Sequence, residues 1–394
     1  MRIPMSSPDL TTPEMDAVNH VLQTSYLSIG PQVEAFERAV AAYVGSAHAV
    51  SVNSGTSGLH LAVIAAGVEE GDLVITTPFS FIASANCILY ERAVPIFVDV
   101  DPLTGNIDPA LVAEAAHDLR RQTAAARRWL PPTLRNPKSA PRHLKSILPV
   151  DAFGQPADMD PILAVAREHG LAVIEDSCEA IGAEYKGRPA GTLADAGIFA
   201  FYPNKQITTG EGGMIVTDRQ DWAALFQSLR NQGRDVFDAW LNHTRLGYNY
   251  RMDEMSAALG VTQMRRIEEL LAKRARVAGW YTERLAGQEL VEPPCVAVTT
   301  TRMSWFVYVV RIRPPASRDE VMRSLEEVGI PSRPYFTPIH LQPFYQHKFG
   351  YGRGNFPITE SLGDNCLALP FSSIMTEEQV DDVCQHLLRT LRVS

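Results

Sequence analysis

Short apolar runs alternate with amphipathic segments along the first two-thirds of the chain. The apolar runs lie at residues 48–52, 73–75, 96–98, 147–150, 171–174, 198–201 and 214–216. Between several of them the apolar positions recur at the helical period, as in the segment that begins at Asp160 and Pro161 and stops at Gly170. Strands that alternate with helices form a largely parallel sheet covered on both faces. The pattern therefore predicts an α/β protein.

The pattern changes after about residue 252. Helices are expected at residues 254–285, 318–328 and 377–391, and a strand at residues 305–312. We predict a large domain over residues 1–252, with the N-terminal segment included. A smaller C-terminal α+β domain over residues 253–394 is expected to begin with a connecting helix.

One segment, residues 118–145, fits neither domain because it combines several prolines with many basic side chains. The basic residues are Arg120, Arg121, Arg127, Arg128, Arg135, Lys138, Arg142 and Lys145. A solvated excursion on the surface, between a helix and the strand at residue 147, is the favoured interpretation. The alternative is a cationic lip that attracts a phosphorylated substrate.

Length and charge exclude several classes of protein. The 394 residues are enough for two or three domains, and no apolar run reaches the ~18 residues that a membrane-spanning helix needs. The first residues lack the apolar stretch of a secretory signal. The net charge of −9 disfavours nucleic acid as the main partner, because a phosphate backbone repels such a surface.

The cysteines indicate the compartment. Cys87, Cys178, Cys295, Cys366 and Cys384 are dispersed and include no Cys-x-x-Cys pair. An odd, dispersed set is typical of buried thiols in a reducing compartment and not of disulfides or a zinc site. We therefore expect a cytoplasmic protein without a membrane partner or a metal centre.

Three short features carry candidate chemistry. Residues 53–58 form a small-residue turn that leads into a helix, where backbone N–H groups and the helix dipole can bind phosphate. Glu175 and Asp176 end an apolar strand at the edge where α/β folds build their sites, although Asp176 alone could be a helix cap. Lys205 follows another apolar strand and precedes the glycine-rich residues 208–213, so a cofactor can approach it closely.

Each feature is weak alone, but together they are specific. A phosphate cradle, an acid and a lysine 29 residues beyond that acid are the set that pyridoxal phosphate needs. The lysine forms the Schiff base, the carboxylate keeps the pyridine nitrogen protonated, and the cradle anchors the phosphate. The glycine-rich loop has neither the dinucleotide fingerprint nor the P-loop spacing, so it does not support a nucleotide cofactor.

Over nearly the whole chain, apart from the basic segment, the sequence resembles the DegT/StrS family of vitamin-B6-dependent sugar aminotransferases. The matching motifs are residues 27–37, 54–56, 79–86, 97–101, 153–156, 175–176, 201–205, 247–252 and 338–343. The resemblance implies the aspartate-aminotransferase type of fold (PLP fold type I), with a large domain built on a mostly parallel sheet.

The resemblance implies roles for individual residues. Lys205 would carry pyridoxal 5'-phosphate as an internal aldimine, and Asp176 would hold the ring nitrogen. The other implied cofactor contacts are Gly55 and Thr56 at the phosphate, Phe81 against the ring, Glu179 near the ring, and Asn249 at the phosphate of the neighbouring site in a homodimer. Tyr335 and His340 fall in a segment that lines the family's sugar pocket.

Two positions depart from the family's pattern. Five residues before the lysine, many members have a serine that binds the phosphate, but this chain has Ala200, so we expect one phosphate contact to be missing. Where many members read Val-His before Phe-Gly, this chain has Val150, Asp151 and Ala152. The sequence offers no physical reason for that second change.

The implied reaction is a ping-pong transamination. L-glutamate would give its amino group, the cofactor would wait as pyridoxamine 5'-phosphate, and a nucleotide-linked keto-sugar (4-keto-6-deoxy or 3-keto) would receive the group. A cyclitol ketone is an alternative acceptor, and a non-enzymatic cofactor-binding regulator is a further alternative. Lys205 disfavours the family's dehydratase branch, which has histidine there, and Cys366 lies in an apolar stretch unsuited to a carbon–sulfur lyase.

Overall fold

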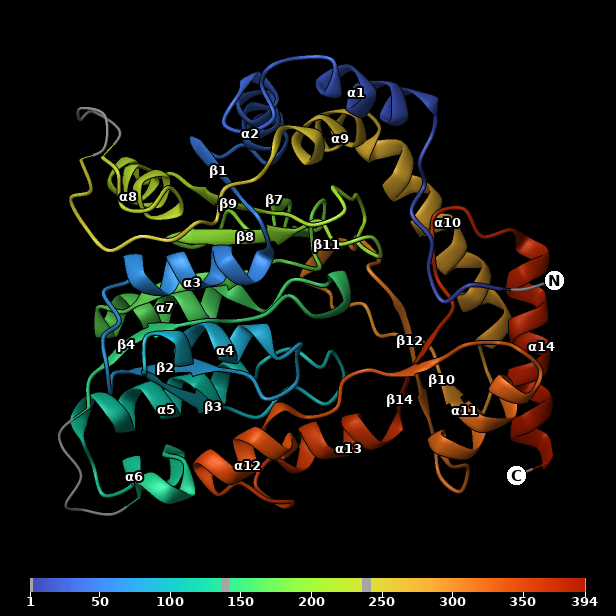
Figure 1. Cartoon of the computed structure of the whole chain (residues 1–394). Coiled ribbons are helices and arrows are strands. Elements are labelled where there is room, and N and C mark those ends of the chain that lie inside the picture. The colour runs from blue at the N-terminus through green and yellow to red at the C-terminus, as the bar shows by residue number, and fades with distance from the viewer. Residues whose placement is uncertain (1–2, 136–141, 236–241, 394) are drawn as a thin grey trace.

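The computed structural model describes residues 3–135, 142–235 and 242–393, and a seven-stranded sheet forms its centre (Figure 1). In spatial order its strands are β1 (His48–Val52), β9 (Gly213–Thr217), β8 (Ala196–Ala200), β5 (Ala172–Asp176), β4 (Leu144–Ile147), β2 (Leu73–Thr76) and β3 (Val94–Phe97). The strands from β8 to β3 pair in parallel, whereas β9 pairs antiparallel with both of its neighbours. The mostly parallel sheet that the sequence predicts is confirmed.

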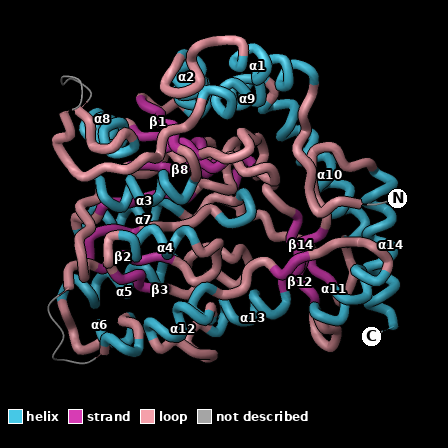
Figure 2. The backbone as a smooth tube through the Cα atoms, in the orientation of Figure 1, coloured by secondary structure: helices cyan, strands magenta, loops and turns pink. Residues whose placement is uncertain are grey.

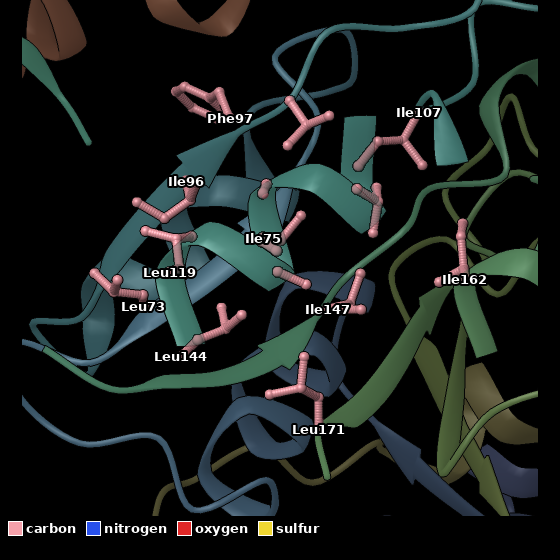
Figure 3. Close-up of a cluster of buried hydrophobic side chains, with 14 of the residues drawn as sticks. Leu73, Ile75, Ile96, Phe97, Ile107, Leu119, Leu144, Ile147, Ile162 and Leu171 are labelled. Atoms are coloured by element: carbon pink, nitrogen blue, oxygen red, sulfur yellow. The ribbon is translucent and has the colours of Figure 1, made fainter. Parts of the chain in front are cut away.

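Helices cover both faces of this sheet. One layer is α3 (Gly55–Ala65), α4 (Ala83–Tyr90) and α8 (Gln220–Arg230), and the other is α2 (Pro31–Val44), α5 (Pro109–Arg121), α7 (Met159–His169) and α9 (Glu254–Arg265). Figure 3 shows part of the second layer, where Leu119 of α5 and Ile162 of α7 belong to one buried cluster with Ile75 and Ile147 of the sheet. Because neither face of the sheet meets solvent, its strands are continuous apolar runs.

The C-terminal part of the chain builds a second, antiparallel sheet. Its order is β10 (Val291–Glu292), β12 (Tyr308–Ile312), β14 (Cys366–Leu369) and β13 (Arg333–Pro334). With α10 (Ile267–Leu285), α11 (Arg318–Glu327) and α14 (Glu377–Val393) it encloses a separate apolar core, to the right in Figure 2. Ile3 also belongs to this second core, although the sequence assigned the N-terminal segment to the large domain.

Shorter elements complete the fold. They are α1 (Thr12–Leu22), α6 (Ala126–Trp129), α12 (Pro343–Phe349), α13 (Pro357–Asn365), the 3-10 turns η1 (Pro132–Leu134), η2 (Ala152–Gly154) and η3 (Ile339–Leu341), and the strands β6 (Glu184–Tyr185), β7 (Arg188–Pro189) and β11 (Thr300–Arg302). β11 comes from the C-terminal part and pairs with β6, which follows β5 of the large sheet. This small sheet therefore ties the two parts together.

The helix expected to have Asp160 as its cap and Pro161 in its first turn begins two residues earlier, at Met159, so Asp160 lies in its first turn. Asp158 occupies the cap position, but its carboxylate accepts a hydrogen bond from the Tyr185 hydroxyl at 2.6 Å and does not cap the helix. The helix ends before Gly170, as predicted, because that residue adopts the left-handed conformation.

The run expected as one helix over residues 254–285 is two helices, α9 and α10, which meet at Arg266. The Arg266 guanidinium is held by Asp9 at 3.0 Å, Glu14 at 2.8 Å and Glu269 at 3.1 Å. α9 packs against α1 and α2, whereas α10 packs against α14 in the second core. One straight helix could not make both sets of contacts. No helix in the described ranges has the length and apolar character to cross a membrane.

Two further expectations hold only in part. The strand expected at residues 305–312 begins at Tyr308, because Trp305 adopts a left-handed conformation with φ of 52°. Three of the cysteines are buried, but Cys178 is only half-buried and Cys295 is exposed.

The N-terminus of α2 depends on a carboxylate from α9. Gly30 stands at its N-cap position without a side chain that could cap it. The Glu254 carboxylate instead accepts hydrogen bonds from the backbone N–H groups of Gly30 (2.9 Å), Gln32 (2.8 Å) and Val33 (3.0 Å). Its negative charge also lies at the positive end of the α2 dipole. This one residue therefore joins α2 to α9.

We expect Glu254→Ala to lower the free energy of unfolding by about 3 kcal/mol, because three N–H groups at a buried site lose their acceptor. Urea unfolding followed by circular dichroism measures the change. Glu283→Ala removes an exposed carboxylate from α10 and is the matched control, with an expected change below ~0.5 kcal/mol. Equal losses in the two variants would contradict the capping role.

Candidate active site

The carboxyl ends of the parallel strands surround a cavity of about 770 Å³. β1, β2, β4, β5 and β8 all end at this edge, and residues at or just beyond each strand end line the cavity. Open α/β sheets form their ligand sites at this edge. The facing wall comes from the C-terminal part, through Phe306 and side chains between residues 334 and 342.

Asp176 is the last residue of β5, and its nearly buried carboxylate lines the cavity. Oδ2 accepts a hydrogen bond from the Ser84 hydroxyl at 2.7 Å, and Oδ1 accepts one from the N–H of Cys178 at 3.2 Å. These two donors fix the orientation of the carboxylate. The element that follows Asp176 in the described chain is β6 and not a helix, so Asp176 is not a helix cap.

Lys205 lies beyond the end of β8, and its side chain reaches the same cavity. Nζ is 3.5 Å from Oε1 of Glu179 and 3.8 Å from the centre of the Phe306 ring. Glu179 in turn accepts a hydrogen bond from the N–H of Phe153 at 2.9 Å, and burial raises the pKa of Glu179. An acid and an aromatic face therefore hold the amine at the cavity, where 12% of the lysine side chain is exposed.

The first turn of α3 forms a third part of the wall. Ser54 caps this helix by accepting a hydrogen bond from the N–H of Ser57 at 3.1 Å, and Gly55 and Thr56 follow along the cavity. Such a helix N-terminus attracts phosphate through its free N–H groups and its dipole. A Cβ atom on Gly55 would lie 2.8 Å from the methyl carbon of Ala200, so α3 approaches β8 this closely only with small residues at both positions.

The remaining predicted residues divide into two groups. Phe81 and Tyr335 line the cavity. His340 does not, because its side chain is fully buried with Nε2 3.1 Å from Oε1 of Glu360. Asn249 is exposed and lies outside the lining of its own chain's cavity. The roles of His340 and Asn249 stay predictions.

Sequence reasoning did not single out several residues that also line the cavity. They are Tyr202, Asn204, Glu211, Phe306 and Gln342. Tyr202 and Asn204 are close neighbours of Lys205, so the motif that marked the lysine could have indicated them. Gln342 lies in the motif at residues 338–343, which could have indicated it, whereas no local pattern marks Phe306.

The described residues of the basic segment, 118–135 and 142–145, lie away from this chain's cavity. None of its described residues lines the cavity, and it leads into Leu144 at the amino end of β4, opposite the cavity edge. Trp129 packs against the core of the large sheet and donates a hydrogen bond from Nε1 to Asp118 at 2.9 Å. The described residues therefore give the cationic lip no support at this chain's own cavity, and the solvated excursion holds only in part. Lys138 lies outside the described residues.

A second pair of acids lies behind Asp176. Asp151 and Glu175 are both fully buried, and Asp151 accepts hydrogen bonds from the Ser177 hydroxyl at 2.6 Å and the Ala157 N–H at 2.8 Å. Burial, together with the charge of Glu175, raises the pKa of Asp151 well above its usual range. Asp151 therefore acts as a structural acid that joins the turn after β4 to the end of β5.

The cavity fits pyridoxal phosphate. A lysine amine, a buried carboxylate and a helix N-terminus match the aldehyde, the ring nitrogen and the phosphate of this cofactor, and all three line one cavity. Gly55 keeps the cradle open, since a side chain there would collide with its neighbours. The fold and the site together define the class of pyridoxal-phosphate enzymes with the aspartate-aminotransferase type of fold.

A model described as the DegT/DnrJ/EryC1/StrS aminotransferase family matches residues 8–388, and the chain belongs to this family. Aminotransferases of this family depend on pyridoxal phosphate. The chain is 40% identical to the GDP-perosamine synthase of Caulobacter vibrioides, in a match that covers 99% of this chain and 98% of that protein.

Two solved structures share the fold over their whole length. DesV of S. venezuelae, in complex with a ketimine intermediate, has a TM-score of 0.86 at 30% identity and 98% coverage of both chains. Spr1654 of Streptococcus pneumoniae, in its PLP form, has a TM-score of 0.88 at 25% identity and covers 100% of this chain and 99% of its own. The predicted family, fold type and transaminase class are confirmed.

We expect Asp151→Asn to gain stability relative to the wild type as the pH rises. Asparagine imitates the protonated acid, whereas the wild type takes up a proton at Asp151 when it folds above the ordinary pKa of an aspartate. Because the folded pKa of Asp151 is raised, the stability it contributes is complete in acid and is lost as the pH rises toward that folded pKa. Above the ordinary pKa of an aspartate, the difference in unfolding free energy should therefore move steadily in favour of the variant as the pH rises.

Urea unfolding at each pH measures this difference. Asp16→Asn, which removes an exposed carboxylate from α1, is the control, and its difference from the wild type should stay constant within ~0.5 kcal/mol. An equally flat profile for Asp151→Asn would show that Asp151 is charged in the folded protein.

Proposed function

We propose that this chain is a pyridoxal-phosphate-dependent aminotransferase that transfers an amino group from L-glutamate to a keto-sugar carried by a nucleotide. One observation carries the proposal: the Lys205 side chain and the Asp176 carboxylate line the same cavity of a chain that belongs to an aminotransferase family. The full-length likeness to a GDP-perosamine synthase supports a nucleotide sugar as the acceptor. The product would be an amino sugar for polysaccharide or natural-product biosynthesis.

Pyridoxal phosphate supplies an aldehyde that combines with amino groups and a protonated ring that draws electrons from the α-carbon of the amino acid. With the cofactor bound, Lys205 would hold it at the aldehyde through Nζ. The Asp176 carboxylate, oriented by its two hydrogen-bond donors, keeps a proton on the ring nitrogen. Gly55 and Thr56, in the first turn of α3, would hold the phosphate, and Phe81, which lines the same cavity, would lie against the ring.

With the cofactor bound, the Lys205 amine would serve as general base and acid, because Nζ would hold and move the proton of the amino donor's α-carbon. Glu179, 3.5 Å from Nζ, and the Phe306 ring, 3.8 Å away, hold the amine in place. Phe306, Tyr335 and Phe336 form an aromatic wall that limits the access of water. The keto-sugar then takes the amino group by the same steps in reverse.

The sugar is proposed to meet the wall from the C-terminal part of the chain. Tyr335 and Gln342 line the cavity there and are the proposed contacts. His340 lies outside the cavity lining and acts indirectly. Its contact with Glu360 fixes η3, and Ile339 of η3 lines the cavity. Lys205 favours transamination over the dehydration that a histidine at this position supports.

We also propose a homodimer with shared active sites. Phe81 and Tyr202 line the cavity yet are 64% and 52% exposed, which leaves large aromatic surface at its mouth. Asn249 is exposed and is flanked by the stacked rings of Tyr248 and Tyr250. Exposed aromatic side chains at one edge are typical of an interface. A second copy would cover them and would receive Asn249 at its phosphate.

Borohydride reduction of the holoenzyme should fix the cofactor on Lys205, because this lysine side chain lines the cavity. Peptide mass spectrometry locates the adduct, and L-glutamate alone should change the absorbance of the bound cofactor. Lys205→Ala should give no adduct at that position and lose at least about 100-fold in turnover. Lys186→Ala, which removes an exposed lysine paired with Asp160, should keep both properties. A wild-type adduct on a different lysine would overturn the site.

Mixed dimers of Lys205→Ala and Asn249→Ala subunits test the shared site. If Asn249 serves the neighbouring site, one site of a mixed dimer carries both lesions and the other carries neither. Dimers purified through two different tags should then have about half the activity of the wild-type dimer, since one intact site of two remains. If Asn249 serves its own chain, each site carries one lesion and the mixed dimer stays inactive. No recovery after proven exchange, or an active monomer, contradicts the proposal.

A further inference from the structure

Arg274 is a positive charge sealed inside the protein. It lies on α10 with an exposed fraction of 2%, and none of the acidic side chains in the described ranges pairs with it. Burial lowers the pKa of Arg274 to about 10, so the side chain stays charged at neutral pH. Burying a charge without a counter-ion makes the free energy of folding less favourable, and the proposed reaction does not use this charge.

Backbone carbonyl groups hold the guanidinium in place of an acid. Nη1 donates hydrogen bonds to the carbonyl oxygens of Trp305 at 3.2 Å and Phe306 at 3.1 Å. Nη2 donates to those of Asn204 at 3.2 Å and Lys205 at 2.5 Å. The planar fork of an arginine can bind two chain segments at once in this way, whereas a lysine ammonium cannot reproduce the fork.

The same two segments meet again in the cavity. Nζ of Lys205 lies 3.8 Å from the centre of the Phe306 ring, so the residues whose carbonyl oxygens bind Arg274 also touch through their side chains. The position of the amine depends on the spacing of these two backbones, and Arg274 bridges them. Nε of Arg274 has no hydrogen-bond partner among the described residues, so the guanidinium is held by the carbonyl oxygens and by the Phe371 ring, whose centre lies 5.6 Å from its central carbon.

We propose that Arg274 is a positioning residue for the reaction, which fixes the Lys205 amine against Phe306 and places an unpaired positive charge behind the cavity. The inference rests on the proposed function of Lys205 as the lysine that binds the cofactor. Like charges in a medium of low dielectric constant repel strongly, so the guanidinium disfavours a further positive charge where Lys205 joins the cofactor. A purely structural role, which only fastens α10 to the large sheet, predicts no change in that chemistry.

Three variants of the holoenzyme separate these roles. Arg274→Met removes both the fork and the charge, and Arg274→Lys keeps the charge but not the fork. Tyr281→Phe is the matched control, since it removes another buried hydrogen bond of α10, from the Tyr281 hydroxyl to the Pro370 carbonyl at 2.8 Å, and does not touch the cavity lining. The measurements are the pH titration of the absorbance of the bound cofactor, and kcat and KM for L-glutamate.

In Arg274→Met the pH midpoint of the absorbance change should rise by about one unit, and kcat should fall about 100-fold with KM nearly unchanged. Arg274→Lys should keep the wild-type midpoint and lose kcat to a similar extent. Tyr281→Phe should leave both values near those of the wild type. These results would support Arg274 as a positioning residue that acts through geometry and charge.

A wild-type midpoint in Arg274→Met, or a kcat of Arg274→Lys within a few-fold of the wild type, would overturn the inference. If Arg274→Met does not fold, the kcat of Arg274→Lys decides alone. Borohydride treatment of the wild type distinguishes a failure of the proposed function from a failure of this inference alone. A wild type without a reducible linkage on Lys205 defeats the proposed function and this inference with it, whereas a normal wild type with unaltered variants defeats the inference only.

Discussion

The shared direction of β1, β2, β4, β5 and β8 is the constraint on which the site depends. Asp176 ends β5 and Lys205 follows β8, and these two strands pair in parallel, so both residues come out at the same edge of the sheet. An antiparallel β8 would have carried Lys205 to the opposite edge. β9 does run antiparallel, and accordingly it is the start of β9, after Gly212, that lies at the cavity. The helix dipole of α3 points into the same space because α3 follows β1 at this edge.

Because these strand ends meet at one edge of the sheet, several ionisable side chains are buried close to one another. Asp176 and Glu179 stand at the cavity with Lys205, and Asp151 lies one layer deeper. Burial raises the pKa of Glu179 and of Asp151, because in a poorly solvated site the neutral acid has a lower free energy than the charged one. Arg274 adds a cation on the far side of Lys205 without adding an acid. The site can hold its charges only because hydrogen bonds replace the lost water at each of them.

The parts of the site that the sequence predicts are those that strand ends define locally. Gly55, Asp176 and Lys205 each follow or end an apolar strand, and in an α/β fold that position is enough to place them at one edge. Phe306 and Arg274 carry no such signal, since their place depends on how the second core docks against the first. The basic segment left two interpretations open for a different reason, because a run of charges does not indicate at which end of a strand it will lie.

The two parts of the chain contribute different kinds of side chain to the cavity. In the proposed reaction the large sheet supplies the reacting amine and acid, Lys205 and Asp176, whereas the C-terminal part supplies Phe306 beside the amine and the wall around Tyr335 and Gln342. The two parts are tied by the pairing of β11 with β6 and by the hydrogen bonds of Arg274 to Lys205 and Phe306. Substitutions in the wall can therefore change which acceptor fits while the reacting groups keep their places, provided that these ties are left intact. Such an arrangement allows one fold to serve acceptors of different shape without a change in the groups that move the proton.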